Sequence, residues 1–194
     1  KMDRTKNRPF PTKRINPDLS LAISLVFIVG GTLLLWWKVN LLTSWLTLLI
    51  VLSYDLLYTP MKRFSWLNTT VGAFPGAIPP MLGWTAYTNT VSIEAWILFA
   101  ILFMWQHPHF FAIGWIYRKD YKQGNIKLIS TLEETGLISA LNAVFYAVLL
   151  IPISMAPSLQ GLSGKFYLYG AGVLSLCYLI SSLLFLKKPG ESTA

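Results

Sequence analysis

Long apolar runs separated by short polar loops dominate the chain. Six of them approach the roughly 20 residues that a helix needs to cross the hydrocarbon of a bilayer. They are Leu19–Trp37, Leu41–Tyr58, Thr70–Tyr87, Ile93–Tyr117, Leu137–Met155 and Phe166–Leu186. Glycines and prolines interrupt the third run, as is tolerated in membrane helices that pack on neighbours or line a cavity. The pattern predicts an all-α polytopic membrane protein, a single transmembrane domain over residues 1–194 with about six transmembrane helices.

Composition supports this class. The chain is 54% hydrophobic and only 12% charged, whereas soluble domains are about one quarter charged. A net charge of +8 could indicate nucleic-acid binding, but the basic residues lie in short loops between apolar runs. That placement is typical of membrane topology, and we expect no nucleic-acid partner. Cys177 is the only cysteine, which excludes an intrachain disulfide.

The basic residues fall almost entirely on one side of the predicted membrane. That side holds 14 of the 16: Lys1, Arg4, Lys6, Arg8, Lys13, Arg14, Lys62, Arg63, Arg118, Lys119, Lys122, Lys127, Lys187 and Lys188. The positive-inside rule makes it cytoplasmic, or the matrix side in an organelle. We therefore predict chemistry at the inner surface of a bacterial plasma membrane or, alternatively, of the mitochondrial inner membrane.

Two basic segments on this side suit a diphosphate. In Tyr58–Arg63, Tyr58 and Lys62 are four residues apart, which would place them on one helix face. Pro60 instead favours a helix that ends at Tyr58. Asp3–Arg14 is the second segment, and its arginines provide bidentate phosphate donors. For both segments the alternative is anchoring at the lipid interface.

A third segment combines polar groups at membrane depth with an acid at the surface. At 100° per residue, Gln106, His109 and Asp120 fall along one stripe of a continuous helix, whereas His107 is offset by roughly 200°. Asp120 is either a surface ion-pair partner or, with a second acidic cluster, a Mg²⁺ ligand. No such cluster occurs in this sequence. Each histidine could also simply bond a neighbouring helix.

Five sequence motifs occur together in a recognisable order. They are Met-x-Arg-Thr-x-x-Arg-Pro over residues 2–9, Tyr58–Arg63, Asn68–Trp84, Trp-Gln-x-Pro-His-Phe over residues 105–110, and Asp120-Tyr121. In this series the chain resembles the UbiA-type intramembrane prenyltransferases, and specifically their heme-modifying branch. The resemblance implies a nine-helix bundle. It also implies that this chain lacks the first two helices, with the main aspartate motif before Lys1, and the last helix.

The resemblance further implies a reaction and a set of site residues. Farnesyl diphosphate would alkylate the vinyl group of heme B to give heme O, with Mg²⁺ as cofactor. The catalytic residues would be Asp120, Tyr58 and Lys62, and Asp120 would share Mg²⁺ with the aspartates expected before Lys1. Diphosphate would be held by Arg4, Arg8, Lys62, Arg63 and Lys119. We assign His109 and Gln106 to heme, His109 as a possible iron ligand.

Two other functions remain open from the sequence. One is prenylation of an aromatic quinone precursor on the same fold, and the other is a non-catalytic membrane protein that transports or handles heme. An inverted repeat between chain halves would support a transporter, and none is visible. Beyond the bilayer and the two substrates, possible partners are a heme A synthase or factors that assemble a terminal oxidase.

Overall fold

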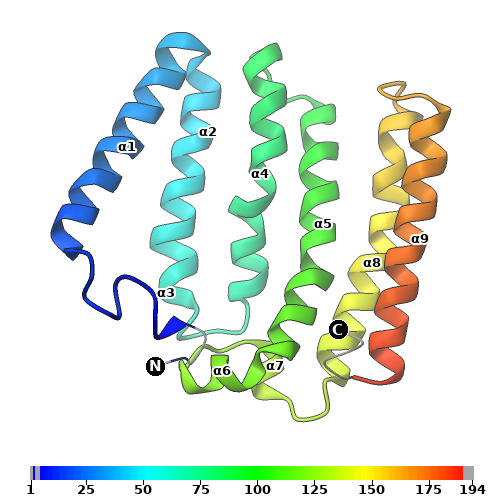
Figure 1. The fold of residues 1–194 in the computed structure, drawn as a ribbon. Coiled ribbons are helices and arrows are strands. Elements are labelled where there is room, and N and C mark those ends of the chain that lie inside the picture. The colour runs from blue at the N-terminus through cyan, green and yellow to red at the C-terminus, as the bar shows by residue number, and fades with distance from the viewer. Residues whose placement is uncertain (1, 3–4, 190–194) are drawn as a thin grey trace.

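The computed structural model describes residues 2 and 5–189, and the regular structure in that part of the chain is helical. The elements are α1 (Pro17–Lys38), α2 (Leu41–Leu52), the π-helical η2 (Ser53–Tyr58), α3 (Thr59–Met61), α4 (Asn68–Thr88), α5 (Ile93–Ile116), α6 (Arg118–Gln123), α7 (Ile129–Leu132), α8 (Leu137–Leu159) and α9 (Lys165–Lys187). Because α2, η2 and α3 run on without a break, the described chain has six long helical rods (Figure 1).

Five of these rods are long and apolar enough to cross a membrane: Pro17–Lys38, Leu41–Met61, Ile93–Ile116, Leu137–Leu159 and Lys165–Lys187. The remaining rod, α4, has 21 residues but does not reach their hydropathy. Its glycines, threonines and three prolines lower the value, yet it stands beside the others in Figure 1. The fold class predicted from the apolar pattern is confirmed, and the protein is an integral membrane protein.

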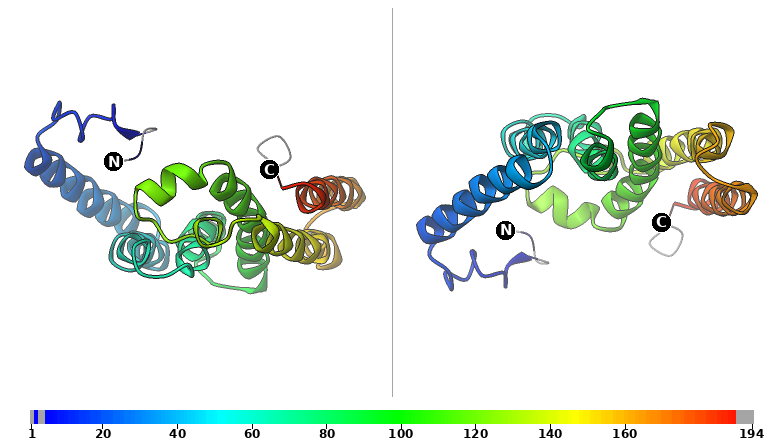
Figure 2. Two further views of the ribbon diagram at one scale, coloured as in Figure 1. Left: turned by 90° about the horizontal axis from the view of Figure 1, so that it is seen from below. Right: turned by 90° about the horizontal axis from the view of Figure 1, so that it is seen from above.

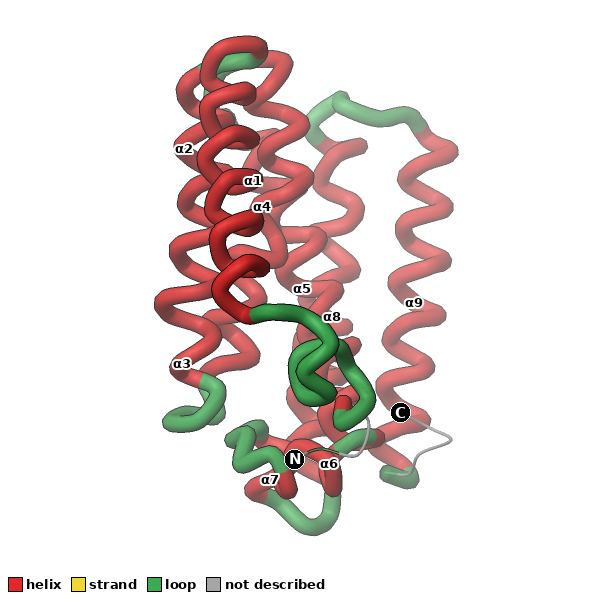
Figure 3. Tube along the Cα trace, turned by 60° about the vertical axis from the view of Figure 1, so that its left-hand side comes forward, coloured by secondary structure: helices red, strands yellow, loops and turns green. Residues whose placement is uncertain are grey.

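The rods stand in an open, curved row rather than a closed bundle. Viewed end-on, the row runs from α1 through α2, α4 and α5 to α8 and α9 (Figure 2). Helix α5 packs against both α4 and α8, whereas α1, described over its whole length, has no buried residue. Several connecting segments gather at one end of the rods, the lower end in Figure 1 (Figures 1 and 3). They are the N-terminal segment, the loop after α3, and the short helices α6 and α7.

Two apolar clusters fix the position of α5. Toward its N-terminus, Phe99 and Ala95 are buried against Ala77, Ile78 and Met81 of α4. Toward its C-terminus, the buried set is Phe111 and Trp115 with Ala140 and Ala143 of α8 and Phe185 of α9. Small residues on α4 and α8 let the backbones approach closely, as is common between membrane helices. Helix α5 is thus held on two sides.

The structure corrects the predicted end of the second helix. The chain does not leave the helix at Tyr58 but continues to Met61 through Pro60. The π-helical turn of η2, in which the Thr59 N–H donates to the Tyr54 carbonyl, comes immediately before that proline. Its wider winding lets a proline follow without the clash that an ideal α-helix would have. Tyr58 and Lys62 therefore do share a face.

The stripe predicted from Gln106 to Asp120 is wrong at its far end. Helix α5 stops at Ile116, Tyr117 adopts φ −100° and ψ 21°, and α6 starts at Arg118 in a new direction. The Arg118 guanidinium donates to the Trp115 carbonyl at 2.8 Å, which satisfies an acceptor freed at the helix end. Asp120 is consequently out of register with His109.

Candidate active site

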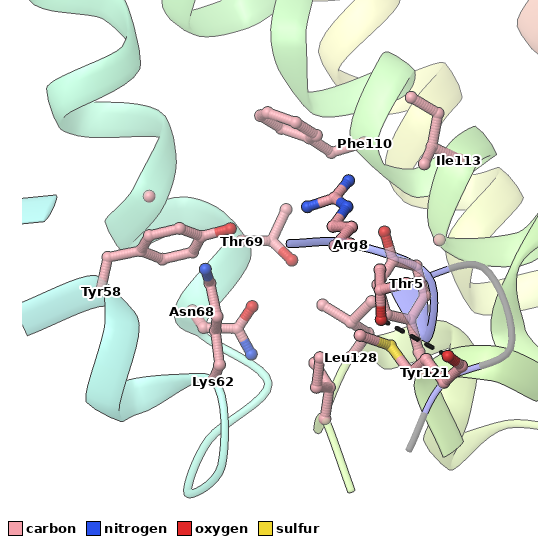
Figure 4. Close-up of a pocket in the computed structure, with 14 residues that line it drawn as sticks. Thr5, Arg8, Tyr58, Lys62, Asn68, Thr69, Phe110, Ile113, Tyr121 and Leu128 are labelled. Carbon is pink, nitrogen blue, oxygen red and sulfur yellow. Dashed lines mark hydrogen bonds between the residues drawn. The ribbon is translucent and has the colours of Figure 1, made fainter. Parts of the chain in front are cut away.

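A cavity of about 400 Å³ opens where the gathered loops meet the helix ends. Its walls come from the N-terminal segment, the end of the second rod, the start of α4, the last turns of α5, and the chain from α6 to α7. The lining residues are Met2, Thr5, Arg8, Tyr58, Lys62, Asn68, Thr69, Gly72, Phe110, Ile113, Gly114, Tyr121, Ile126 and Leu128. Figure 4 shows them around the opening.

The cavity carries positive charge from two side chains. Arg8 and Lys62 line it, and its lining within the described chain includes no carboxylate. Burial lowers the pKa of Lys62, while the nearby Asp55 carboxylate acts in the opposite direction. The Lys62 ammonium also lies 4.1 Å from the Tyr58 ring centroid, a cation–π distance. Two cations, a half-buried Lys62 and an exposed Arg8, with no carboxylate in the described lining favour an anionic ligand.

The position of Tyr58 depends on a glycine. A Cβ atom added at Gly72 would lie 2.5 to 2.9 Å from three atoms of the Tyr58 ring. The ring thus packs directly on the α4 backbone, with its hydroxyl directed toward Thr69 and the space occupied by Arg8 (Figure 4). Tyr58, Lys62 and Arg8, three of the residues predicted for the site, therefore meet in one cavity.

The other side of the cavity is apolar. Phe110 and Ile113 of α5 provide the hydrocarbon contacts on this side, and Leu128 of the α6–α7 connection adds an apolar contact on the loop side. Phe110 and Ile113 lie on the membrane side of Arg8, and Lys62 lies on the loop side of Tyr58 (Figure 4). A ligand with an anionic head and an apolar tail matches this division.

Several lining residues were not predicted as site residues. Asn68, Thr69 and Gly72 occupy the first turns of α4, and Tyr121 follows Asp120. The sequence signal for α4 was a glycine-rich, interrupted helix, which indicates close packing and does not single out any polar position. Asn68 is the most deeply buried polar group of this set, at 1% exposure.

Other predicted residues lie outside the cavity lining. Arg63 and Lys119 are exposed, and Asp120 is half-buried beside Tyr121 without lining the cavity. Arg4 lies outside the described residues. Within residues 2 and 5–189, no three histidine, cysteine, aspartate or glutamate side chains come together as a metal site. The role of Asp120 as a Mg²⁺ ligand stays a prediction.

The polar groups of α5 have separate surroundings. Gln106 is buried and donates to the Ala73 carbonyl of α4 at 2.6 Å, so its amide serves the α4–α5 contact. The assignment of Gln106 to the heme site stays a prediction. His107 stacks on Tyr146 of α8 at 3.9 Å between ring centroids, and it points away from His109 as predicted.

His109 lies on the exposed side of α5. Its ring stacks on Trp105, with 5.3 Å between centroids and 16° between planes. Trp105 borders a groove of about 700 Å³ between α5, α8 and α9, and the Tyr178 hydroxyl of α9 donates to the Trp105 carbonyl at 2.9 Å. The stacked pair thus presents a flat aromatic surface between this groove and the charged cavity.

A model of the UbiA prenyltransferase family matches residues 1–194, the whole chain. The chain belongs to the UbiA prenyltransferase family. No significant match to a solved structure accompanies the family match.

Three relatives of this chain are named protoheme IX farnesyltransferase. This chain is 43% identical to the protoheme IX farnesyltransferase of Solibacter usitatus, and the match covers 94% of this chain and 63% of the relative. The chain is 41% identical to the protein of that name from Koribacter versatilis, over 95% of this chain and 60% of the relative. It is 38% identical to the one from Myxococcus xanthus, over 100% of this chain and 66% of the relative. The chain thus spans about three fifths to two thirds of the relatives' length.

Proposed function

We propose that this chain forms a large part of an enzyme that transfers a farnesyl group from farnesyl diphosphate to a vinyl group of heme B, giving heme O. The observation that carries the proposal is the cavity in which Arg8 and Lys62 face an apolar wall without an acidic residue in the described lining. The relatives named protoheme IX farnesyltransferase match nearly the whole chain and support heme as the acceptor.

The reaction that this implies is a substitution followed by hydration. The bond between the allylic carbon and the diphosphate oxygen breaks, and its electron pair leaves with the diphosphate. The allylic carbon bonds to the terminal vinyl carbon, and water then adds to the cation beside the macrocycle with loss of a proton. Charge neutralisation at the leaving group and restricted water at the cation are the main requirements.

The side chains of the cavity meet the first requirement. Lys62 and Arg8 would neutralise the negative charge that grows on the leaving diphosphate. Tyr58 would direct its hydroxyl to the same head group, while Phe110 and Ile113 keep water from the allylic end. Arg63 and Lys119 are exposed, and there they would attract the anion before it enters. UbiA-type enzymes generally depend on Mg²⁺, which we expect Asp120 to help bind.

The product identifies the acceptor. We expect membranes containing the full-length protein, supplied with farnesyl diphosphate and heme B, to form heme O in a Mg²⁺-dependent reaction. Parallel assays would offer an aromatic acid of the quinone-precursor class in place of heme. Prenylated aromatic acid without heme O would overturn the acceptor assignment. Absence of both products would contradict prenyl transfer altogether.

His109 is proposed to contact the acceptor heme. Its imidazole is exposed and stacked on Trp105, where a planar macrocycle could extend the stack and the imidazole could reach iron. We expect His109→Ala in the full-length protein to raise KM for heme about tenfold while KM for farnesyl diphosphate stays within twofold. The shift of the heme Soret band that accompanies binding to the unmodified protein should be absent in His109→Ala. An unchanged KM and spectrum would remove His109 from the heme site.

The titration of Lys62 predicts how diphosphate binding depends on pH. Burial lowers its pKa, so the charged form, and with it diphosphate binding, should be lost as pH rises through a value below the ordinary 10.5. Asp55 favours the charged form, so Asp55→Asn should move the loss to still lower pH. Calorimetry with inorganic diphosphate between about pH 7 and 10 measures this. Glu94→Gln, at the end of α5 away from the cavity, is the control. If Asp55→Asn left the pH dependence of diphosphate binding unchanged, the proposed influence of Asp55 on Lys62 would be contradicted.

A further inference from the structure

Asn68 joins the two loops that border the charged end of the cavity. Its side-chain nitrogen donates to the Ser65 carbonyl at 2.6 Å and also to the Lys127 carbonyl, across the cavity mouth. The Lys127 N–H in turn donates to the Lys62 carbonyl at 2.8 Å. Asn68, Lys127 and Lys62 are thereby linked in series, and the loop that carries Lys62 is tied to the segment that precedes α7.

These contacts also determine which way the amide faces. Both acceptors are backbone carbonyl oxygens, so the NH₂ group must point toward them. The amide oxygen is left on the cavity side (Figure 4). It is buried and has no hydrogen-bond partner among the described residues. A buried acceptor without a partner is unfavourable because its hydrogen bond to water is lost, so a ligand or water in the cavity would be stabilised by donating to it.

From this geometry we propose that Asn68 is a positioning residue for the diphosphate. Its amide nitrogen, through the Lys127 backbone, keeps the Lys62 segment at the cavity wall. Its amide oxygen accepts from a water molecule that bridges to the bound phosphate oxygens. The inference rests on the proposed function, because it takes a diphosphate as the anion in the cavity. It adds an amide side chain to a site otherwise explained by Arg8, Lys62 and Tyr58.

A double-mutant cycle with Lys62 tests the proposal. Inorganic diphosphate binding would be measured by calorimetry on the full-length protein, together with KM and kcat for farnesyl diphosphate. We expect Asn68→Ala alone to weaken diphosphate binding about tenfold and raise KM for farnesyl diphosphate, with KM for heme unchanged. In a Lys62→Met background the same change should weaken binding less than threefold, because much of its effect acts through Lys62.

The controls separate this proposal from the proposed function. Asn142 of α8 also donates its amide to a backbone carbonyl, that of Ile138 at 2.8 Å, so Asn142→Ala removes a similar bond away from the cavity and should leave binding unchanged. If Lys62→Met fails to weaken diphosphate binding, the diphosphate site itself is wrong. If Lys62→Met weakens it but Asn68→Ala has no effect, or equal effects in both backgrounds, the role of Asn68 alone is overturned.

Discussion

Lys62→Met is expected to lower kcat/KM for prenyl transfer in the full-length protein by about a hundredfold. The ammonium lies against the Tyr58 ring inside a cavity whose only other described cationic lining residue is Arg8. Removing one preorganised charge that faces a leaving group typically costs about 10²- to 10³-fold in rate. Methionine keeps much of the length and apolar contact of the lysine stem. Steady-state kinetics with farnesyl diphosphate would measure the loss.

Two further variants test whether the loss of kcat/KM is caused by removing the positive charge of Lys62 in particular. Lys62→Arg should recover only part of the activity, because a planar guanidinium does not reproduce a compact ammonium against the Tyr58 ring. Lys165→Met removes a lysine from the start of α9, at the ends of the rods that lie away from the cavity. This change should leave kcat/KM within twofold. Equal activity in Lys62→Met and in the unmodified protein would exclude Lys62 from the diphosphate site.

Gly72→Ala is expected to reduce kcat/KM at least tenfold through the displacement of Tyr58. The new methyl group would lie within 3 Å of three atoms along one edge of the Tyr58 ring, and the Tyr58 backbone in η2 is fixed by the helix. The ring must swing away from α4, and Lys62 loses the surface against which it packs. Overpacking of this kind typically costs about 1–3 kcal/mol of stability. Prenyl transfer and thermal unfolding would be measured on the same preparation.

Helix α4 also provides the matched control. A Cβ atom at Gly83 would meet nothing within 4 Å, so Gly83→Ala makes the same chemical change in the same helix without a clash. We expect its activity within twofold of the unmodified protein. If Gly72→Ala retained full activity, Tyr58 would not need its present position, and the description of the cavity would have to change.

The helical rods could be predicted from the sequence because burial in a bilayer demands long apolar runs. The runs at Leu41, Ile93 and Leu137 begin where the structure begins its helices. The ends were less predictable. Pro60 argued for a stop that η2 removes, and no residue between Ile116 and Arg118 indicates a break. Helix ends depend on tertiary contacts such as the bond from Arg118 to Trp115, which local sequence does not reveal.

The site was predictable where charge identified it. Arg8 and Lys62 could be expected at one membrane face from the distribution of basic residues, and the structure brings them into one cavity. Asn68 could not be predicted as a site residue, because a single asparagine in a polar turn is an ordinary residue at the start of a helix. Its importance comes from the Lys127 carbonyl, which lies 59 positions away in the chain. Contacts of that range emerge only from the packing of α4 against the α6–α7 segment.

The π-helical turn at Ser53–Tyr58 places one more residue in the rod than an α-helical register would hold. Every side chain after it is therefore rotated by about 100° relative to an uninterrupted α-helix. Tyr58 and Lys62 reach the α4 side because of that phase shift, whichever side chains fill the turn itself. The geometry of the site is thus encoded partly as a residue count, which a single insertion or deletion in α2 would change at once.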